Sequence, residues 1–459
     1  MKKFARCAVI VALASAAAPL MAAAQTTTPT GLTPAFGSGA GVNLQPIHSS
    51  GMFQRDRNVS VRERRRPDYE ARGLREGPIW FYPKLETDFE YDDNIYPLLP
   101  APKVSDTIFR VKPELDVQSN WSRHYFDVYA RAAFNEYVSH GSESTTDWDV
   151  GSDYRIDVVR GTDVKFGAED ARLTEPRTSN GTQANAAKPV QFLAGLAYLL
   201  GEREVNRVKV SLRGDWSKFD FISVPAIGGG ILNENFRDRQ TYDVVGRAEY
   251  AVSPDTSVFV SGGGNWRKYR LAPTLAFNPL PRNSSGYQFL TGVNFDLTAL
   301  LRGEIGVGYM SQTYDTSPFI PNPTGFSKYP DVSGVAAEAK VEWFPTRLTT
   351  VTASVNRTIE ESAIINSGGF LATTAGLQID HELLRNVIIT GNGTFENDAY
   401  NGIDRTDHLY SAGLSATYLL NHNVGLNVGY TYYKQTSGGL AAGPTFDLNR
   451  ATVGLVLQF

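Results

Sequence analysis

Residues 126–135, FDVYARAAFN, decide the fold of this chain. Apolar or small side chains stand at every second position from Phe126 to Phe134, and polar ones such as Asp127, Arg131 and Asn135 occupy positions between them. A period of two is the pattern of a β-strand with one apolar and one polar face. About ten such residues are enough for a tilted strand to cross a membrane.

The same alternation recurs along the rest of the chain, in about 18 segments between Lys84 and Phe459. An even number is expected of bacterial single-chain outer-membrane barrels. We predict strands over residues 84–93, 107–118, 123–137, 146–159, 162–172, 189–200, 205–218, 239–252, 256–269, 285–299, 302–314, 332–344, 348–360, 370–381, 386–397, 406–419, 423–435 and 446–459.

The connections between these segments alternate in length. Tight turns are predicted at residues 160–161, 253–255, 345–347 and 420–422, and long polar loops at 174–188, 220–238, 271–284 and 314–331. Short periplasmic turns and long outer loops are typical of outer-membrane barrels, and closure is required because backbone groups in lipid find no water. The predicted fold class is all-β, a closed antiparallel transmembrane β-barrel of about 18 strands with a mobile N-terminal extension.

The N-terminal part of the sequence differs from the rest. Basic residues at 2, 3 and 6, a small-to-apolar stretch over 7–21 and three alanines predict a signal peptide over residues 1–24, cleaved near Ala24. Residues 25–78 are rich in Arg, Pro and Gly and predict a disordered periplasmic extension, followed by the barrel over 79–459. The run RERRR at 62–66 is either a solvated tail or a contact for an anionic partner, and both interpretations stay open.

The C-terminal stretch ATVGLVLQF, residues 451–459, alternates strictly and ends on Phe459. This ending is similar to the terminal strand that the barrel-assembly machinery reads in bacterial outer membranes. We therefore expect localisation to the cell outer membrane of a Gram-negative bacterium. The expected partners are outer-membrane lipid and, through Phe459, the assembly machinery.

Composition excludes several other classes of protein. The formal net charge is −4, and the single cysteine, Cys7, lies inside the predicted signal peptide, so neither a disulfide framework nor thiolate chemistry is expected. The sequence has no G-x-S-x-G motif, no phosphate-binding loop and no dinucleotide-binding glycine motif. We expect no enzyme, no cofactor, no metal site and no nucleic-acid partner.

The polar faces of the strands supply the candidate functional residues. A barrel of this size leaves an aqueous channel, so charges on its inner face are tolerated. Both signs of charge occur there, which predicts no strong ion selectivity. These side chains either pair and stiffen the wall or form a polar path that hydrogen-bonds sugars, and the two roles are compatible. The candidate lumen-lining residues are Asp127, Arg131, Arg155, Arg207, Arg213, Asp243, Arg247, Arg267, Glu338 and Lys340.

A cluster of oxygen donors ends the first predicted strand. Asp92, Asp93 and Asn94 form the candidate rim, with Tyr91 and Tyr96 on either side. We predict that the three polar side chains hydrogen-bond the backbone of the turn and that the tyrosines anchor at the outer interface. A cation site shared with another loop is the alternative.

Two weaker patterns suggest chemistry at the outer rim. His140 with Ser142, or His408 with Asp404 and Asp407, would suit a rim-located outer-membrane hydrolase, although loop residues in water are the favoured interpretation. Residues 397–407, NDAYNGIDRTD, alternate oxygen ligands around a glycine but lack the ligand set of an EF-hand. A plain loop is favoured there as well.

The opening of the barrel region carries a family resemblance. LETDFEYDDNIY at residues 85–96, Asp106, the PEL at 113–115 and Trp121, with Gly161 and the segment 169–177, resemble the putative β-barrel porin 2 family. The resemblance implies a proteobacterial outer-membrane barrel without catalytic residues, associated with exopolysaccharide production. We therefore expect a channel for polar solutes or polymers that exports exopolysaccharide and contacts polysaccharide and periplasmic export components. A general or sugar-selective diffusion porin is the alternative.

Overall fold

The computed structural model describes residues 59–99, 102–179, 181–271, 280–297, 300–318, 327–364 and 366–459. The predicted signal peptide and residues 25–58 of the predicted extension lie outside these ranges. Over the described residues, no helix combines the length and the apolar character needed to cross a membrane.

The predicted fold class is confirmed. Within the described residues, β2 to β8 and β11 to β21 form one antiparallel ring of 18 strands, closed by the pairing of β2 with β21. The predicted strand at 256–269 matches β12, and most other predicted ends lie within a few residues of the observed ones. The largest differences are at the start of the first strand, which begins at residue 79 rather than 84, and at the end of β7, which ends at residue 205 rather than 200.

The barrel strands and the smaller elements have the following bounds: β1 Leu74–Glu76, β2 Ile79–Asp92, β3 Asp106–Ser119, β4 Tyr125–Tyr137, β5 Thr145–Val159, β6 Thr162–Thr174, β7 Gln191–Val205, β8 Val208–Phe221, β9 Val224–Pro225, β10 Ile231–Leu232, β11 Arg239–Ser253, β12 Thr256–Tyr269, β13 Ser284–Leu297, β14 Leu301–Tyr314, β15 Val332–Thr346, β16 Thr349–Glu361, β17 Gly369–Leu384, β18 Val387–Tyr400, β19 Thr406–Leu419, β20 Val424–Gly438 and β21 Phe446–Gln458, with the 3₁₀ turns η1 Gly141–Glu143 and η2 Asn235–Arg237.

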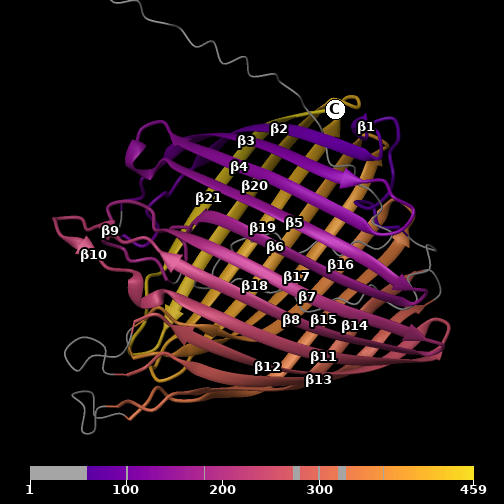
Figure 1. Ribbon diagram of the computed structural model, residues 1–459. Helices are drawn as coiled ribbons and strands as arrows, with labels where there is room; N and C mark the ends of the chain where they lie inside the picture. Colours follow the sequence, from indigo (N-terminus) through magenta and orange to yellow (C-terminus); the bar gives the residue numbers. More distant parts are fainter. Residues whose placement is uncertain are drawn as a thin grey trace, which may run out of the picture.

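The two ends of the barrel differ as the connection lengths predicted. Short turns join the strands at the end where β1 pairs with β2, and we call it the periplasmic end by the rule for outer-membrane barrels. The long connections, including the small hairpin of β9 and β10, project from the opposite, extracellular end. Figure 1 shows this hairpin on the left of the barrel and β1 on the right.

The outer surface of the wall is apolar, as a membrane-spanning barrel requires. Along β8, Val208, Val210 and Leu212 point outward and are 42%, 49% and 61% exposed. The positions between them carry Lys209, Ser211 and Arg213, which face the interior. This alternation places lipid contact outside and polar groups inside.

Closure of the ring is reinforced by charges on the inner face of its seam. Arg450 of β21 forms an ion pair with Asp92 of β2 at 2.7 Å and approaches Glu90 at 3.8 Å. Glu90 also accepts two hydrogen bonds from Arg110 of β3, each 2.8 Å long. The first and last strands of the chain are thus joined by side chains as well as by their backbone ladder.

We expect Asp92→Ala to destabilise the barrel by about 3 kcal/mol, because it leaves the guanidinium of Arg450 without its nearest carboxylate. The measurement is the temperature at which the folded band converts to the unfolded band in semi-native gel electrophoresis. Asp92→Ala combined with Arg450→Ala should recover part of the loss. A single variant as heat-resistant as the wild type would contradict a role for this pair in closure.

Candidate functional site: the barrel lumen

Nine of the ten candidate lumen residues lie on strands at positions that face the interior. Arg131, Arg213 and Arg247 form ion pairs there, with Glu114, Asp215 and Glu304 respectively. The exception is Arg207, which is exposed in the turn between β7 and β8. The prediction for Arg207 is therefore wrong. The polar positions of β8 repeat in the sequence back to residue 207, but the strand itself begins only at Val208.

On the wall between β4 and β8, two tyrosines lie flat over glycines. Tyr129 covers Gly151 and donates a hydrogen bond to Glu169 at 3.0 Å. Tyr198 covers Gly167, where an added Cβ would lie 2.6 Å from its ring, and donates to Asp153 at 2.8 Å. A larger residue at either glycine would push the ring off the wall.

Arginines cover the open faces of these rings. The guanidinium carbon of Arg131 lies 4.2 Å from the ring centre of Tyr129, and that of Arg213 lies 4.7 Å from the ring of Tyr198. The wall therefore presents guanidinium groups and carboxylates to the lumen rather than bare aromatic faces. Such stacked and ion-paired arginines are held in place, which favours the interpretation that the charges stiffen the wall.

The same construction recurs between β11 and β14. Phe259 lies over Gly292, where an added Cβ would be 2.6 Å from its ring, and Arg247 stacks on Phe259 at 3.7 Å. Arg247 then reaches Glu304 with two hydrogen bonds of 2.7 Å. This bridge joins strands that have two others between them, so it fixes the curvature of the wall.

At the extracellular end, the tips of β16 and β17 leave the wall and fold into the lumen. The ladder between β15 and β16 ends at Ala337↔Arg357, although β15 extends to Val332 and β16 to Glu361. Beyond that point Ile359 and Leu371 pack with Met310 and Ala336, which lie on the inner faces of β14 and β15. The face of β16 that meets lipid lower down, at Val355, therefore becomes an internal packing face.

The folded tip carries Glu361 inward, past β13, β14 and β15, to β11 and β12. Its carboxylate lies 2.8 Å from Arg239 of β11 and 3.5 Å from Arg267 of β12, and it accepts a hydrogen bond from Tyr269. A cavity of about 190 Å³ lies beside this cluster, lined by Arg239, Asp243, Arg267 and Glu361 among others. We call Arg239, Arg267, Tyr269 and Glu361 the cross-lumen cluster.

At the periplasmic end, residues 59–72 form a strap along the inner side of the mouth. Glu63 pairs with Arg302 of β14 at 2.7 Å, and Arg62 pairs with Asp380 of β17 at 2.9 Å. Farther along, the carbonyl of Tyr69 accepts a hydrogen bond from Gln458 of β21. The strap thus spans the mouth from β14 round to β21.

Arg66 is the central residue of the strap and is 2% exposed. Its guanidinium donates to Glu382 and to the carbonyl of Val61, both at 2.8 Å, and to the carbonyls of Arg64 and Arg385. The sequence prediction placed this segment in a disordered extension. Residues 59–72 are instead held by the barrel, because carboxylates on the inner face of β17 pair with the RERRR run.

Attachment of the strap depends on pH through Glu63. Burial alone would raise the pKa of Glu63, but the charge and hydrogen bond of Arg302, together with hydrogen bonds from Ser60, outweigh burial and hold that pKa below its ordinary value. The stabilisation from this pair is therefore present at neutral pH and is lost as the pH falls through the lowered pKa.

The candidate rim residues bind protein groups. Asp92 is 1% exposed and faces inward to Arg450, as the polar alternation of β2 up to Glu90 could have indicated. Asp93 accepts two hydrogen bonds of 2.7 Å from Asn449, and Asn94 donates to the carbonyl of Asp447. Burial alone would raise the pKa of Asp93, but these bonds and Lys103 hold it below its ordinary value.

The two tyrosines that flank the rim have different surroundings. Tyr91 is 50% exposed on the outer face, where an interfacial anchor is expected. Tyr96 instead packs edge-on against His140, with the ring centres 5.8 Å apart, and lies below Arg177. The expectation that Tyr96 anchors at the outer interface is therefore wrong.

The structure separates His408 from Asp407 and gives His140 a carboxylate partner, Asp106. Asp407 faces inward and pairs with Arg405, whereas His408 stacks on Phe395 at the outer face of the wall. His140 contacts Asp106, whose carboxylate also accepts backbone N–H groups of the loop. Among the described residues, no group of three or more His, Cys, Asp or Glu side chains is arranged to hold a metal ion.

One buried ion cluster in the extracellular loops was missed by sequence reasoning. Arg237 is 5% exposed and pairs with Glu175 at 2.7 Å and Glu234 at 3.2 Å. Burial alone would lower the pKa of Arg237, but Glu175 and Glu234 raise it above its ordinary value. The available signal for this cluster was that Glu175 lies in the segment 169–177, which carries part of the family resemblance.

We expect Glu382→Ala to release the strap, because it removes the carboxylate shared by Arg64 and Arg66 while leaving every tryptic site in place. Tryptic cleavage within residues 59–72 should accelerate by about tenfold or more, since it reports the open population. Glu76→Ala, at an exposed position of the same end, is the matched control. Equal cleavage of the two variants would show that the strap is held by other contacts.

The match to a protein family agrees with the barrel architecture. A search of curated proteins finds no match. Among solved structures, OpdL of Pseudomonas aeruginosa is 12% identical, with 84% of this chain and 100% of that chain covered and a TM-score of 0.42. The siderophore receptor PirA of Acinetobacter baumannii is 9% identical, with coverages of 82% and 80% and a TM-score of 0.44. Residues 66–459 match the family described as "Putative beta-barrel porin 2", and the chain belongs to that family of outer-membrane β-barrels.

Proposed function

We propose that this outer-membrane barrel is a controlled channel for polar polymers and that its cargo is exported exopolysaccharide. The observation that carries the proposal is the narrowing of a polar lumen at both ends. The inward-folded tips of β16 and β17, with the cross-lumen cluster, occupy part of the extracellular half, and the strap follows the periplasmic mouth. A channel that conducts on demand suits a polymer exporter better than a diffusion pore, which stays open.

A general or sugar-selective diffusion porin is the second candidate. It is favoured by the mixed charges of the wall, where Arg213 with Asp215 and Arg247 with Glu304 neutralise each other. Such a wall does not select strongly for one sign of ion. The two candidates differ in conductance, which is low for the narrowed exporter and high for the open porin.

Targeting and assembly are further parts of the proposal. Residues 1–24 act as a signal peptide cleaved near Ala24, and polysaccharide and periplasmic export components are partners of the barrel. Phe459 is 42% exposed at the end of the last strand, which suits recognition by the barrel-assembly machinery. The outward apolar face binds outer-membrane lipid.

Glu361→Ala is expected to increase single-channel conductance in planar bilayers, because the cross-lumen cluster loses the carboxylate that three side chains share. Arg239 and Arg267 then remain without their shared counter-charge, so the reversal potential in a salt gradient should shift toward anion selectivity. Lys268→Ala, beside the cluster in sequence but exposed on the outer face of β12, is the control. A wild-type channel already as conductive as the Glu361→Ala variant would favour the diffusion porin.

The export part is tested by deleting the gene and measuring secreted polysaccharide. We expect secretion to fall while the polymer accumulates in the periplasm. Unchanged secretion would contradict the export function. Channel activity is tested separately, by the conductance measurement.

A further inference from the structure

Arginines gather at the periplasmic mouth and form a positively charged surface. Three come from the strap (Arg62, Arg65 and Arg72), and two lie in the adjacent turns, Arg347 before β16 and Arg385 before β18. All five are exposed, with side-chain exposures of 54% for Arg62 and 62% for Arg65. We call this set the mouth arginines.

The strap and the two turns are tied together by hydrogen bonds. Arg64 donates to the carbonyl of Arg347, and Arg66 donates to the carbonyl of Arg385 at 3.2 Å. These contacts bring the two turns and the strap to one side of the mouth. The mouth arginines therefore act as one surface rather than as five separate charges.

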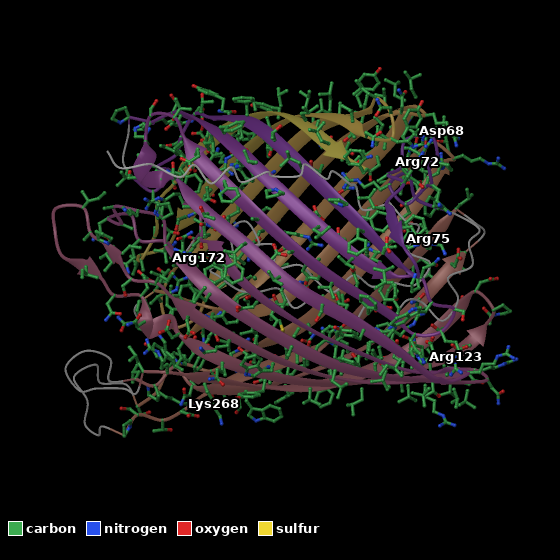
Figure 2. All side chains as sticks on the ribbon, turned by 45° about the horizontal axis from the view of Figure 1, so that its top comes forward. Asp68, Arg72, Arg75, Arg123, Arg172 and Lys268 are labelled. Carbon is green, nitrogen blue, oxygen red and sulfur yellow. The ribbon has the colours of Figure 1, made fainter. Side chains whose placement is uncertain are left out.

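Most of this positive charge is not neutralised by the protein. Within the described residues, no carboxylate lies at ion-pair distance from Arg72, Arg347 or Arg385, and Arg65 reaches Glu70 only at 3.6 Å. The same end adds the exposed Arg75 on β1 and the exposed Arg123 and Arg160 in turns, against a few exposed acids such as Asp68. Figure 2 shows Asp68, Arg72, Arg75 and Arg123 toward the right, where β1 lies.

The extracellular end has a different arrangement. There Lys103 contacts Asp93, Lys328 pairs with Asp331 at 2.7 Å, and Arg270 pairs with Asp238. Basic side chains at that end are largely matched by neighbouring carboxylates. The excess of unpaired arginine is thus a property of the mouth and not of the whole surface.

We propose that the mouth arginines dock a polyanionic polysaccharide, so that the cargo of the channel is an acidic polymer with carboxylate groups. This inference rests on the proposed export function. Guanidinium groups stay charged at all physiological pH values and bind carboxylates in a bidentate manner, and an uncompensated patch at a channel mouth raises the local concentration of an anion. Arg62 pairs with Asp380 on the inner face of β17, which places the patch on the path into the lumen rather than among lipid headgroups.

The test is binding of a fluorescent oligogalacturonate to the purified full barrel in neutral detergent. The variant Arg65→Gln, Arg72→Gln, Arg347→Gln and Arg385→Gln should bind it about tenfold or more weakly and with a shallower dependence on salt. Neutral maltodextrin should not compete. The control removes four charges at the other end through Lys188→Gln, Lys218→Gln, Lys268→Gln and Lys328→Gln, and heat-resistant gel mobility verifies that both variants fold.

An equal loss of oligogalacturonate affinity in both variants would overturn the proposal, because binding would then depend only on the net charge of the protein. Unchanged affinity of the mouth variant, with reduced retention of anionic phospholipid in nanodiscs, would assign the arginines to lipid headgroups instead. Binding does not depend on secretion, so the two proposals fail separately. If gene deletion leaves secretion unchanged while oligogalacturonate binding persists, export is wrong and the docking surface stands.

Discussion

Every backbone hydrogen bond of this wall has to be made inside the sheet, because hydrocarbon offers no partner. The pairing of β2 with β21 satisfies that constraint by joining the two ends of the chain. The constraint also locates the membrane. Above Ala337↔Arg357 the β15–β16 ladder stops, so that part of the wall belongs outside the hydrocarbon layer. The tips of β16 and β17 are consequently free to fold inward without exposing backbone to lipid.

The interior is shaped by arginines that act as long spacers. A flat aromatic ring over a glycine provides the base, a guanidinium stacks on it, and its free edge pairs with a carboxylate, which lies on another strand for Arg131 and Arg247 and on the same strand for Arg213. Arg247 shows the result most clearly, since it stacks on Phe259 and reaches Glu304. Cross-lumen pairs such as Arg239 with Glu361 extend the same chemistry from the wall into the lumen.

The strands of the wall could be predicted from the sequence. The two features that occupy the lumen, the inward-folded tips and the strap, could not. A period of two fixes strand spans and inner faces, because it follows directly from the pleat. It does not by itself show the inward fold of β16, but Arg357 breaks the apolar alternation on the face that carries Val355 and Ile359, and this local signal was not used. The strap was missed because its partners are remote: Arg66 and Glu382 are 316 positions apart, and no local pattern predicts such a contact.

The inward fold of the β16 and β17 tips creates a contact that is impossible in a regular barrel wall. An added Cβ at Gly334, on the inner face of β15, would lie 3.3 Å from Leu371 of β17. If the tips of β16 and β17 stayed in the wall, these two positions would be two strands apart and on opposite faces. The direct measurement is disulfide formation between Gly334→Cys and Leu371→Cys in a Cys7→Ala background. The pair is expected to oxidise readily in the folded barrel. Free thiols, with the cysteine at position 371 labelled from the outer face, would contradict it.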